Sequence, residues 1–162
     1  MKNKVKIYIA SPLGFTESGR LFLNNEIIPI FESLDYGVLD PWQLTKNFNA
    51  PRIKLSFGVR GLKKLKQNNQ VIGNINENAI KEATGLLAIL DGVDIDSGVA
   101  SEIGYASALN KTVLGYRSDF RLSGDNQASI VNLQVEYFIL SRGGKIIEEI
   151  KNLKSELKSM FG

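Results

Sequence analysis

Three short apolar runs, each followed by a polar turn, constrain the fold of this chain more than any other feature. They are KVKIYIA (4–10), GLLAILD (85–91) and KTVLGYR (111–117), and residues that favour strands are frequent in them. Stretches with apolar residues at helical spacing lie between these runs. Because strands that alternate with helices form parallel sheets covered by helices, the pattern predicts an α/β fold.

The same periodicities place the remaining elements. We expect helices over 15–37, 69–84, 97–110 and 130–141, a short strand over 37–43, a long loop over 43–67, and a C-terminal amphipathic helix through Ile147, Ile150, Leu153 and Leu157. For residues 130–141 a strand is the alternative, but the spacing favours a helix. The 162 residues contain no linker or repeat, so we expect one domain over 1–162. Its predicted architecture is a flavodoxin-like or Rossmann-like three-layer sandwich with a mainly parallel sheet of about five strands.

The ends of the expected helices carry capping signals. Thr16 or Ser18 is a candidate cap of the first helix, Pro29 is expected to kink it, and Gly37 stands where a C-terminal glycine belongs. Ser97 is a candidate cap of the helix over 97–110.

The chain contains no cysteine and no histidine. Thiolate catalysis, disulfides and catalytic triads built on histidine are therefore excluded, and the commonest zinc ligand is missing. Acid–base and nucleophilic chemistry must fall to Asp, Glu, Tyr or Lys. The absence of cysteine permits a cytoplasmic location, which we expect because no signal peptide is visible and no run reaches the roughly eighteen apolar residues of a membrane span.

The formal net charge is only +3, and the densest basic stretch is RGLKKLKQNN at residues 60–69. A nucleic-acid contact is one interpretation of this stretch, but a solvated helix face or loop is the preferred one. We therefore expect no nucleic-acid partner and no membrane partner.

An unusual concentration of carboxylates follows the apolar run 85–91. Within DGVDIDSGVASEIGYA (91–106), four acidic residues stand close together: Asp91, Asp94, Asp96 and Glu102. Like charges repel, so such a loop costs stability unless something there needs it. Ligands of parallel sheets bind at the carboxyl ends of the strands. The clusters SPLGF (11–15), DGVDIDSG (91–98) and RSDF (117–120) are therefore expected to converge on one crevice.

Asp96 and Glu102 are the two acids best spaced for chemistry. Glu102 is expected in the second turn of a helix that starts near residue 97, and Tyr8 would end close enough to hold it by a phenolic hydrogen bond. One of two neighbouring carboxylates can attack while the other, with a raised pKa, keeps a proton to donate, as in retaining glycosyl transfer. The alternative is that these acids only cap a helix and solvate a loop.

Four blocks resemble one known family. DGVDIDSGVASEIGYASALNK (91–111) closely resembles the D-x-G-x-x-x-E-x-G-x-A signature of the nucleoside 2-deoxyribosyltransferase family. KIYIASPLGF (6–15), YRSDFRLSGDN (116–126) and VNLQVEYFI (131–139) are similar, in the same order, to further blocks of that family. The resemblance covers about residues 5–145 and is weak over 43–67.

The resemblance implies roles for particular residues. The nucleophile falls on Glu102, the carboxylate that binds or protonates the base on Asp96, and the tyrosine that orients the nucleophile on Tyr8. Further substrate-binding positions are Ser11, Asn76, Asp91, Gly98, Asn132 and Gln134. Asn132 is implied to come from a neighbouring subunit. The chain departs from the family at Asn76, which replaces an aspartate and cannot donate a catalytic proton, and at Gln134, which replaces a methionine.

The family implies transfer of 2-deoxyribose between nucleobases through a covalent deoxyribosyl–glutamate intermediate, without a metal or organic cofactor. The implied partners are nucleosides, nucleobases and further copies of the chain in a dimer, tetramer or hexamer, with IVNLQVEYFIL (130–140) at a subunit contact or, alternatively, as a simple core helix.

Two other functions stay open. One is hydrolysis of deoxynucleoside 5′-monophosphates, for which TESGR (16–20) offers a phosphate cradle; an ordinary capped helix is the preferred interpretation of that segment. The other is a non-catalytic nucleotide-binding domain.

Overall fold

The computed structural model describes residues 4–48, 59–124 and 126–162, and a sheet of five parallel strands forms its centre. The strands are β1 (Lys6–Ala10), β2 (Gly37–Leu39), β3 (Gly85–Ile89), β4 (Val113–Tyr116) and β5 (Lys145–Ile147). Their order is β2-β1-β3-β4-β5, and all neighbours are parallel. This is the flavodoxin-like order, so the predicted α/β sandwich is confirmed.

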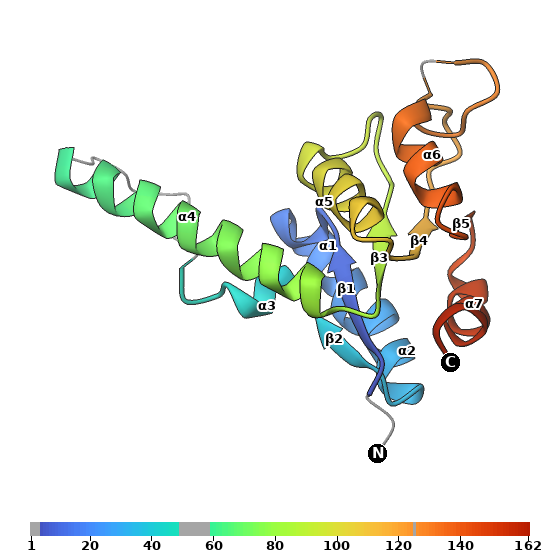
Figure 1. Ribbon diagram of the computed structural model, residues 1–162, viewed down its shortest axis with the longest axis horizontal. Helices are drawn as coiled ribbons and strands as arrows, with labels where there is room; N and C mark the ends of the chain where they lie inside the picture. Colours follow the sequence, from blue (N-terminus) through green and yellow to red (C-terminus); the bar gives the residue numbers. More distant parts are fainter. Residues whose placement is uncertain (1–3, 49–58, 125) are drawn as a thin grey trace.

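Helices and helical turns connect the strands or follow the last of them (Figure 1). They are η1 (Leu13–Phe15), α1 (Glu17–Phe22), η2 (Leu23–Ile27), α2 (Ile28–Ser33), α3 (Pro41–Leu44), α4 (Val59–Glu82), α5 (Ser97–Ala108), α6 (Leu133–Leu140), η3 (Ile150–Asn152) and α7 (Leu153–Phe161). The helix expected within 130–141 is therefore confirmed as α6.

Alternate residues of β1 point to opposite faces of the sheet and into two hydrophobic cores. Tyr8 and Ala10 face the core that α4, α5 and α6 cover. Ile7 and Ile9 face the core formed with α1, η2, α2 and α7. The alternation places the Tyr8 side chain beneath α5. This helix follows residues 91–96, which we call the carboxylate loop.

Two helix starts and one helix interruption have clear local causes. Thr16 caps α1 by accepting a hydrogen bond from Gly19 N at 3.0 Å, as one of the two predicted candidates. The interruption expected at Pro29 is a π-helical turn, η2, just before it, since proline has no N–H to donate. The cap of α5 is Asp96 and not Ser97, because the Asp96 carboxylate accepts hydrogen bonds from Gly98 N and Val99 N.

The first helix, expected over 15–37, ends at Ser33, and Gly37 begins β2 instead of ending the helix. Three further predicted boundaries are wrong. The strand expected over 37–43 ends at Leu39, because Asp40 caps α3 and Pro41 occupies its first turn. The strand β5, which includes Ile147, replaces the start of the predicted terminal helix, and α7 begins only at Leu153.

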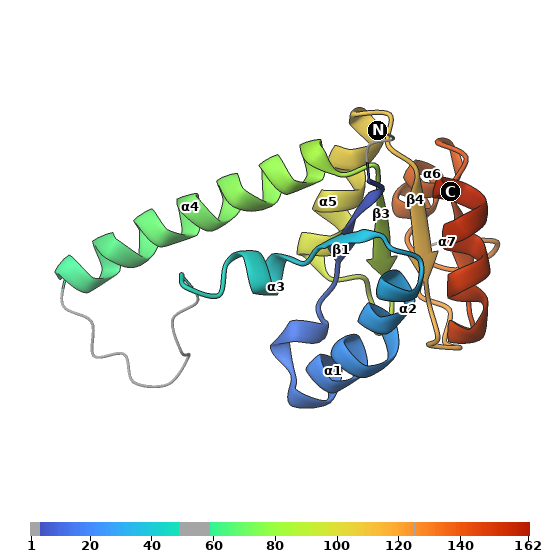
Figure 2. The same cartoon turned by 90° about the horizontal axis from the view of Figure 1, so that it is seen from below.

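The third difference concerns α4, which begins at Val59 and not at residue 69. Its first half projects away from the sheet (Figures 1 and 2) and is rich in polar and basic residues, which explains its weak apolar periodicity. Residues 49–58 of the predicted long loop lie outside the described residues. In the part of the chain that the structure describes, no helix is both long and apolar enough to span a membrane.

Candidate active site

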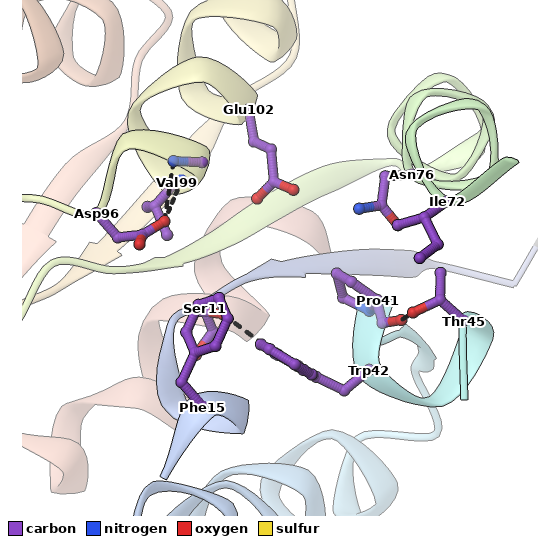
Figure 3. Close-up of a pocket in the computed structure, with 11 residues that line it drawn as sticks. Ser11, Phe15, Pro41, Trp42, Thr45, Ile72, Asn76, Asp96, Val99 and Glu102 are labelled. Carbon is purple, nitrogen blue, oxygen red and sulfur yellow. Dashed lines mark hydrogen bonds between the residues drawn. The ribbon is translucent and has the colours of Figure 1, made fainter. Parts of the chain in front are cut away.

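A cavity of about 280 Å³ lies at the carboxyl ends of β1 and β2, between α5, α4 and α3 (Figure 3). This is the edge of the sheet where ligands of this fold class bind. Its lining combines carboxylates from α5, an amide from α4 and aromatic side chains from the turns after β1 and β2. The lining residues are Ser11, Phe15, Pro41, Trp42, Thr45, Ile72, Asn76, Asp96, Gly98, Val99 and Glu102.

Glu102 and Tyr8 form a hydrogen-bonded pair at this cavity. The Tyr8 hydroxyl group donates to Glu102 Oε1 at 2.6 Å, and the Tyr8 side chain is fully buried. Figure 3 shows the Glu102 carboxyl group pointing from α5 into the cavity. The structure therefore brings together two of the three residues that the sequence assigned to catalysis.

Burial sets the protonation of both groups. Desolvation raises the pKa of Glu102 to about 7, with a smaller increase from the nearby Asp96 charge, while the hydrogen bond from Tyr8 acts in the opposite direction. Desolvation and the Glu102 charge both raise the pKa of Tyr8, so this hydroxyl group stays protonated and can donate. Near neutral pH Glu102 is thus divided between an ionised carboxylate and a neutral acid.

Asp96 stands at the start of α5 and also lines the cavity. Its Oδ1 atom accepts hydrogen bonds from Gly98 N at 2.9 Å and Val99 N at 3.1 Å. A carboxylate at this position also stabilises the positive end of the helix dipole. The two interpretations of Asp96, helix cap and site residue, are therefore compatible in one side chain.

Trp42 and Phe15 form an aromatic wall of the cavity; Phe15 belongs to the predicted SPLGF cluster, whereas sequence reasoning missed Trp42. Their ring centroids are 4.6 Å apart with an interplanar angle of 84°, an edge-to-face contact. Trp42 Nε1 donates to the Ser11 carbonyl oxygen at 3.2 Å, and Trp42 N donates to Asp40 Oδ1 at 3.0 Å. A Cβ atom at Gly14 would overlap the indole ring, so glycine allows this close packing. The available signal was the single tryptophan of the chain, near the end of a predicted strand.

Asn76 contributes the polar group on the α4 side of the cavity (Figure 3). Its Oδ1 atom is buried and has no hydrogen-bond partner among the described residues. Buried amide oxygens normally accept a hydrogen bond, so this atom is an unused acceptor in the wall of the cavity.

The RSDF cluster does not join this cavity, so the prediction of one shared crevice is wrong for it. Residues 117–120 line a separate cavity of about 300 Å³ beside the end of β5. The Asp91 carboxylate accepts hydrogen bonds from Ser118 and Asp119 and does not line the first cavity. Asp91 at the start of one loop pairs with residues 118–119 of the other, so the RSDF cluster lies apart from the first cavity, whereas Asp96 and Gly98 of the first loop still line it.

Two further predicted residues also lie elsewhere. Asn132 caps α6 by accepting a hydrogen bond from Gln134 N at 3.0 Å, and neither residue lines the first cavity. A role for Asn132 in the site of a neighbouring subunit stays a prediction. Among the described residues, no three acidic side chains are close enough to bind a metal ion.

Comparisons with known proteins place this geometry in context. The family model described as nucleoside 2-deoxyribosyltransferase matches residues 7–138. A search of curated proteins finds no match.

Several solved structures share the fold. A conserved protein from Enterococcus faecalis V583 is 22% identical with a TM-score of 0.67, covering 96% of this chain and 98% of its own. A 2-deoxyribosyltransferase from Bacillus psychrosaccharolyticus is 20% identical with a TM-score of 0.65, covering 93% and 90%. A CMP N-glycosidase from Clostridium botulinum is 17% identical with a TM-score of 0.58, covering 95% and 98%.

The family match spans most of the chain, including the Glu102–Tyr8 pair and the carboxylate loop. This chain belongs to the nucleoside 2-deoxyribosyltransferase family.

Proposed function

We propose that this protein transfers 2-deoxyribose between nucleobases by a double displacement at Glu102. Membership of the family indicates an enzyme that transfers or hydrolyses an N-glycosidic bond. The observation that carries the finer proposal is the Glu102 carboxyl group, which is hydrogen-bonded to Tyr8 and points into the cavity.

In the proposed first step, a Glu102 carboxylate oxygen attacks C1′ of a 2′-deoxynucleoside. The C1′–N bond breaks, and its electron pair leaves with the base, which takes a proton from Asp96 or from water. The product is a deoxyribosyl ester of Glu102. A second base then attacks C1′ and releases the Glu102 carboxylate, so the configuration at C1′ is retained overall.

The pKa of Glu102 suits this step. With a pKa of about 7, roughly half of the molecules carry the carboxylate at neutral pH. The Tyr8 hydroxyl group fixes one oxygen and directs the side chain towards the cavity. Because the site is partly desolvated, the carboxylate is weakly hydrated and needs little solvent reorganisation before it attacks.

The opposite wall of the cavity is suited to a nucleobase. The Trp42 indole ring is held by one hydrogen bond from its Nε1 atom and by an edge-to-face contact with Phe15, while the main-chain N–H of Trp42 donates to Asp40. Stacking of a base on such a ring contributes about 1–3 kcal/mol and tolerates different bases. The Asn76 amide can both donate to and accept from a base edge, whereas it cannot protonate the leaving base. Protonation is therefore assigned to Asp96 or water.

Hydrolysis of the same bond is the second candidate. The similarity to a CMP N-glycosidase supports it at the level of the fold. The phosphate cradle that it would need at residues 16–20 has less support, because Thr16 already caps α1 and Arg20 donates to the Gly14 carbonyl oxygen at 3.0 Å. Access of water to the Glu102 ester would decide between transfer and hydrolysis.

A non-catalytic binding domain is the least supported alternative. Burial of an ionisable Glu102 beside Tyr8 destabilises the ionised fold, and a binding site for a nucleoside does not require that cost.

One assay separates these functions. The protein is incubated with a deoxynucleoside plus a second free base, and separately with a deoxynucleoside 5′-monophosphate alone. We expect base exchange in the first mixture, and loss of more than about a thousandfold of its rate in Glu102→Ala. Glu32→Gln, an exposed change on α2 across the sheet, is the matched control and should keep full activity.

If the protein releases free sugar phosphate from the monophosphate and exchanges no base, its activity is hydrolysis and not transfer. If the parent protein and Glu102→Ala bind nucleoside equally well and neither turns over either substrate, the protein is a non-catalytic binding domain.

A further inference from the structure

Arg117 is a buried cation outside the proposed catalytic machinery. It follows β4, and only 2% of its surface is exposed. The three hydrogen bonds that its side chain makes in the described part of the chain all go to main-chain carbonyl oxygens. Nη1 donates to Leu90, and Nη2 donates to Gly92 at 3.2 Å and to Arg121 at 2.5 Å. The guanidinium group therefore ties the start of the carboxylate loop to the loop after β4.

Asp91 completes the connection in the opposite direction. Its Oδ1 atom accepts hydrogen bonds from Ser118 N at 2.5 Å and Asp119 N at 2.8 Å, and its Oδ2 atom accepts one from Ser118 Oγ at 2.8 Å. Each loop thus uses one charged side chain to hold the main chain of the other. We call the Arg117–Asp91 pair, with these contacts, the loop clamp.

The loop clamp holds the segment that leads into α5. Gly92 has a φ of 131°, a conformation that residues with a side chain rarely adopt, so the chain turns sharply beside the clamp. Four residues later Asp96 caps α5, and Glu102 follows one and a half turns into that helix. The clamp therefore fixes one end of the element whose other contacts place Glu102 against Tyr8 of β1.

We propose that Arg117 and Asp91 are positioning residues that hold the carboxylate loop so that Asp96 and Glu102 stand in reactive geometry. This inference rests on the proposed function of Glu102. Asp91 then acts through the loop and not by touching substrate, which differs from the role that the family resemblance assigned to it. A misplacement of reacting groups by about 1 Å can reduce a rate by about a hundredfold, so such a clamp affects rate more than affinity.

The guanidinium group cannot be replaced by a simple positive charge. Its planar arrangement of donors reaches three carbonyl oxygens on two loops, whereas the ammonium group of lysine is a compact point charge on a flexible stem. Arg117→Lys therefore keeps the charge and removes the geometry. Arg121→Gln is the matched control, since the Arg121 side chain pairs with Asp119 at the surface while its main-chain carbonyl still accepts from Arg117.

The kinetic test compares kcat, KM and the pH profile of base exchange in these variants. In Arg117→Lys we expect kcat to fall about tenfold to a hundredfold, while KM changes less than about threefold because Trp42 and Phe15 lie on other elements. The rise of activity with pH should also occur at lower pH. A displaced loop would let water reach Glu102 and move Asp96 away from it, and both changes lower the pKa of Glu102. Arg121→Gln should match the parent protein, and Asp91→Asn, which keeps an acceptor oxygen, should show a smaller loss than Asp91→Ala.

Hydrogen–deuterium exchange of the amides over 92–102 gives a readout that does not need activity. Faster exchange there in Arg117→Lys, and not in Arg121→Gln, supports the loop clamp even if the parent protein transfers no deoxyribose and the proposed function fails. Unchanged amide exchange in Arg117→Lys would contradict the loop clamp. So would a lower kcat that a smaller folded fraction explains entirely, with no shift of the pH profile. Neither result would contradict the proposed transferase activity.

Discussion

Burial of the Glu102 carboxyl group gives the candidate site a defined pH window. Because the attacking form is the carboxylate, kcat/KM for base exchange should rise with pH and reach half of its plateau near pH 7. The hydrogen bond from Tyr8 lowers this pKa, so in Tyr8→Phe the rise of kcat/KM with pH should move to higher pH. It should also reduce kcat/KM on the plateau by about tenfold, the value of one charge-assisted hydrogen bond.

A pH–rate series on the parent protein and Tyr8→Phe checks this prediction. If the rise of kcat/KM stays at the same pH when the hydroxyl group is removed, Tyr8 does not control the ionisation of Glu102.

The same burial predicts that Glu102 destabilises the fold at high pH. Its pKa rises from 4.5 in the unfolded chain to about 7 in the folded protein. The folded state therefore binds the proton more tightly, and its free energy of unfolding falls as the pH rises from 4.5 through 7. Glu102→Gln removes this dependence and keeps an oxygen that can accept from Tyr8. The gain in free energy of unfolding of this variant over the parent protein should therefore be about 3 kcal/mol larger at pH 8 than at pH 4.

Urea unfolding at both pH values measures that difference. Glu32→Gln, which changes an exposed carboxyl group, should show no comparable pH-dependent gain. Equal gains for the two variants would show that the buried environment of Glu102 is not the cause.

At the scale of elements, the aromatic wall depends on close packing between η1 and α3. In Gly14→Ala the new methyl group would overlap the indole ring and displace Trp42 from the cavity. We expect KM for the nucleoside to rise about tenfold, since base stacking contributes about 1–3 kcal/mol. Trp42 is the only tryptophan, so its fluorescence emission should shift in the same variant.

Gly73→Ala is the matched control for this change. Apart from its own helix backbone and its neighbours in sequence, no atom of the described residues lies within 4 Å of a Cβ at Gly73, which is exposed on α4. Alanine there should stabilise the helix by about 0.5–1 kcal/mol without altering KM or the fluorescence. If Gly14→Ala binds nucleoside as well as Gly73→Ala does, the aromatic wall does not bind the base.

The elements also show how far sequence reasoning reaches. The strands β1, β3 and β4 and the helices α5 and α6 were predictable because their apolar residues follow the period of the structure they form. Trp42 was missed because a local cap at Asp40, and not hydrophobic periodicity, ends β2 and starts α3. The strand β5 is too short to show an alternation, and its pairing with β4 is a tertiary contact.

Within the site, the same distinction applies to single residues. Glu102, Asp96 and Tyr8 were predictable because motif spacing and strand alternation place them near one edge of the sheet. The separation of RSDF from the first cavity was not predictable, because it depends on hydrogen bonds between Asp91 and residues 118–119 that leave no periodic trace. The polar contacts between these two loops are thus the part of the site that the sequence did not reveal, in contrast to the Tyr8–Glu102 hydrogen bond.

At the scale of the whole molecule, α6 has an apolar surface that the described residues of the chain leave exposed. Leu133, Tyr137 and Leu140 are 46%, 60% and 52% exposed. Neighbouring exposed apolar side chains of this size are typical of protein–protein contacts. Asn132 caps the same helix, so a contact through α6 would bring this residue towards another copy. This arrangement supports the prediction that the chain forms an oligomer with shared sites.

A complementation experiment tests the shared site. Glu102→Ala and Asn132→Ala should each be inactive alone, because each removes one contributor to every site. If Asn132 acts in the site of a neighbouring subunit, co-expression of the two variants in equal amounts should restore activity. In a two-fold dimer, half of the dimers are mixed, and one of the two sites in each mixed dimer is intact. About a quarter of the parent activity should therefore return. Glu102→Ala co-expressed with Asp96→Ala is the negative control, because both residues line the same cavity of one chain. A monomeric mass in solution, or no recovery in the first mixture, would confine every catalytic group to a single chain and return α6 to a role in packing.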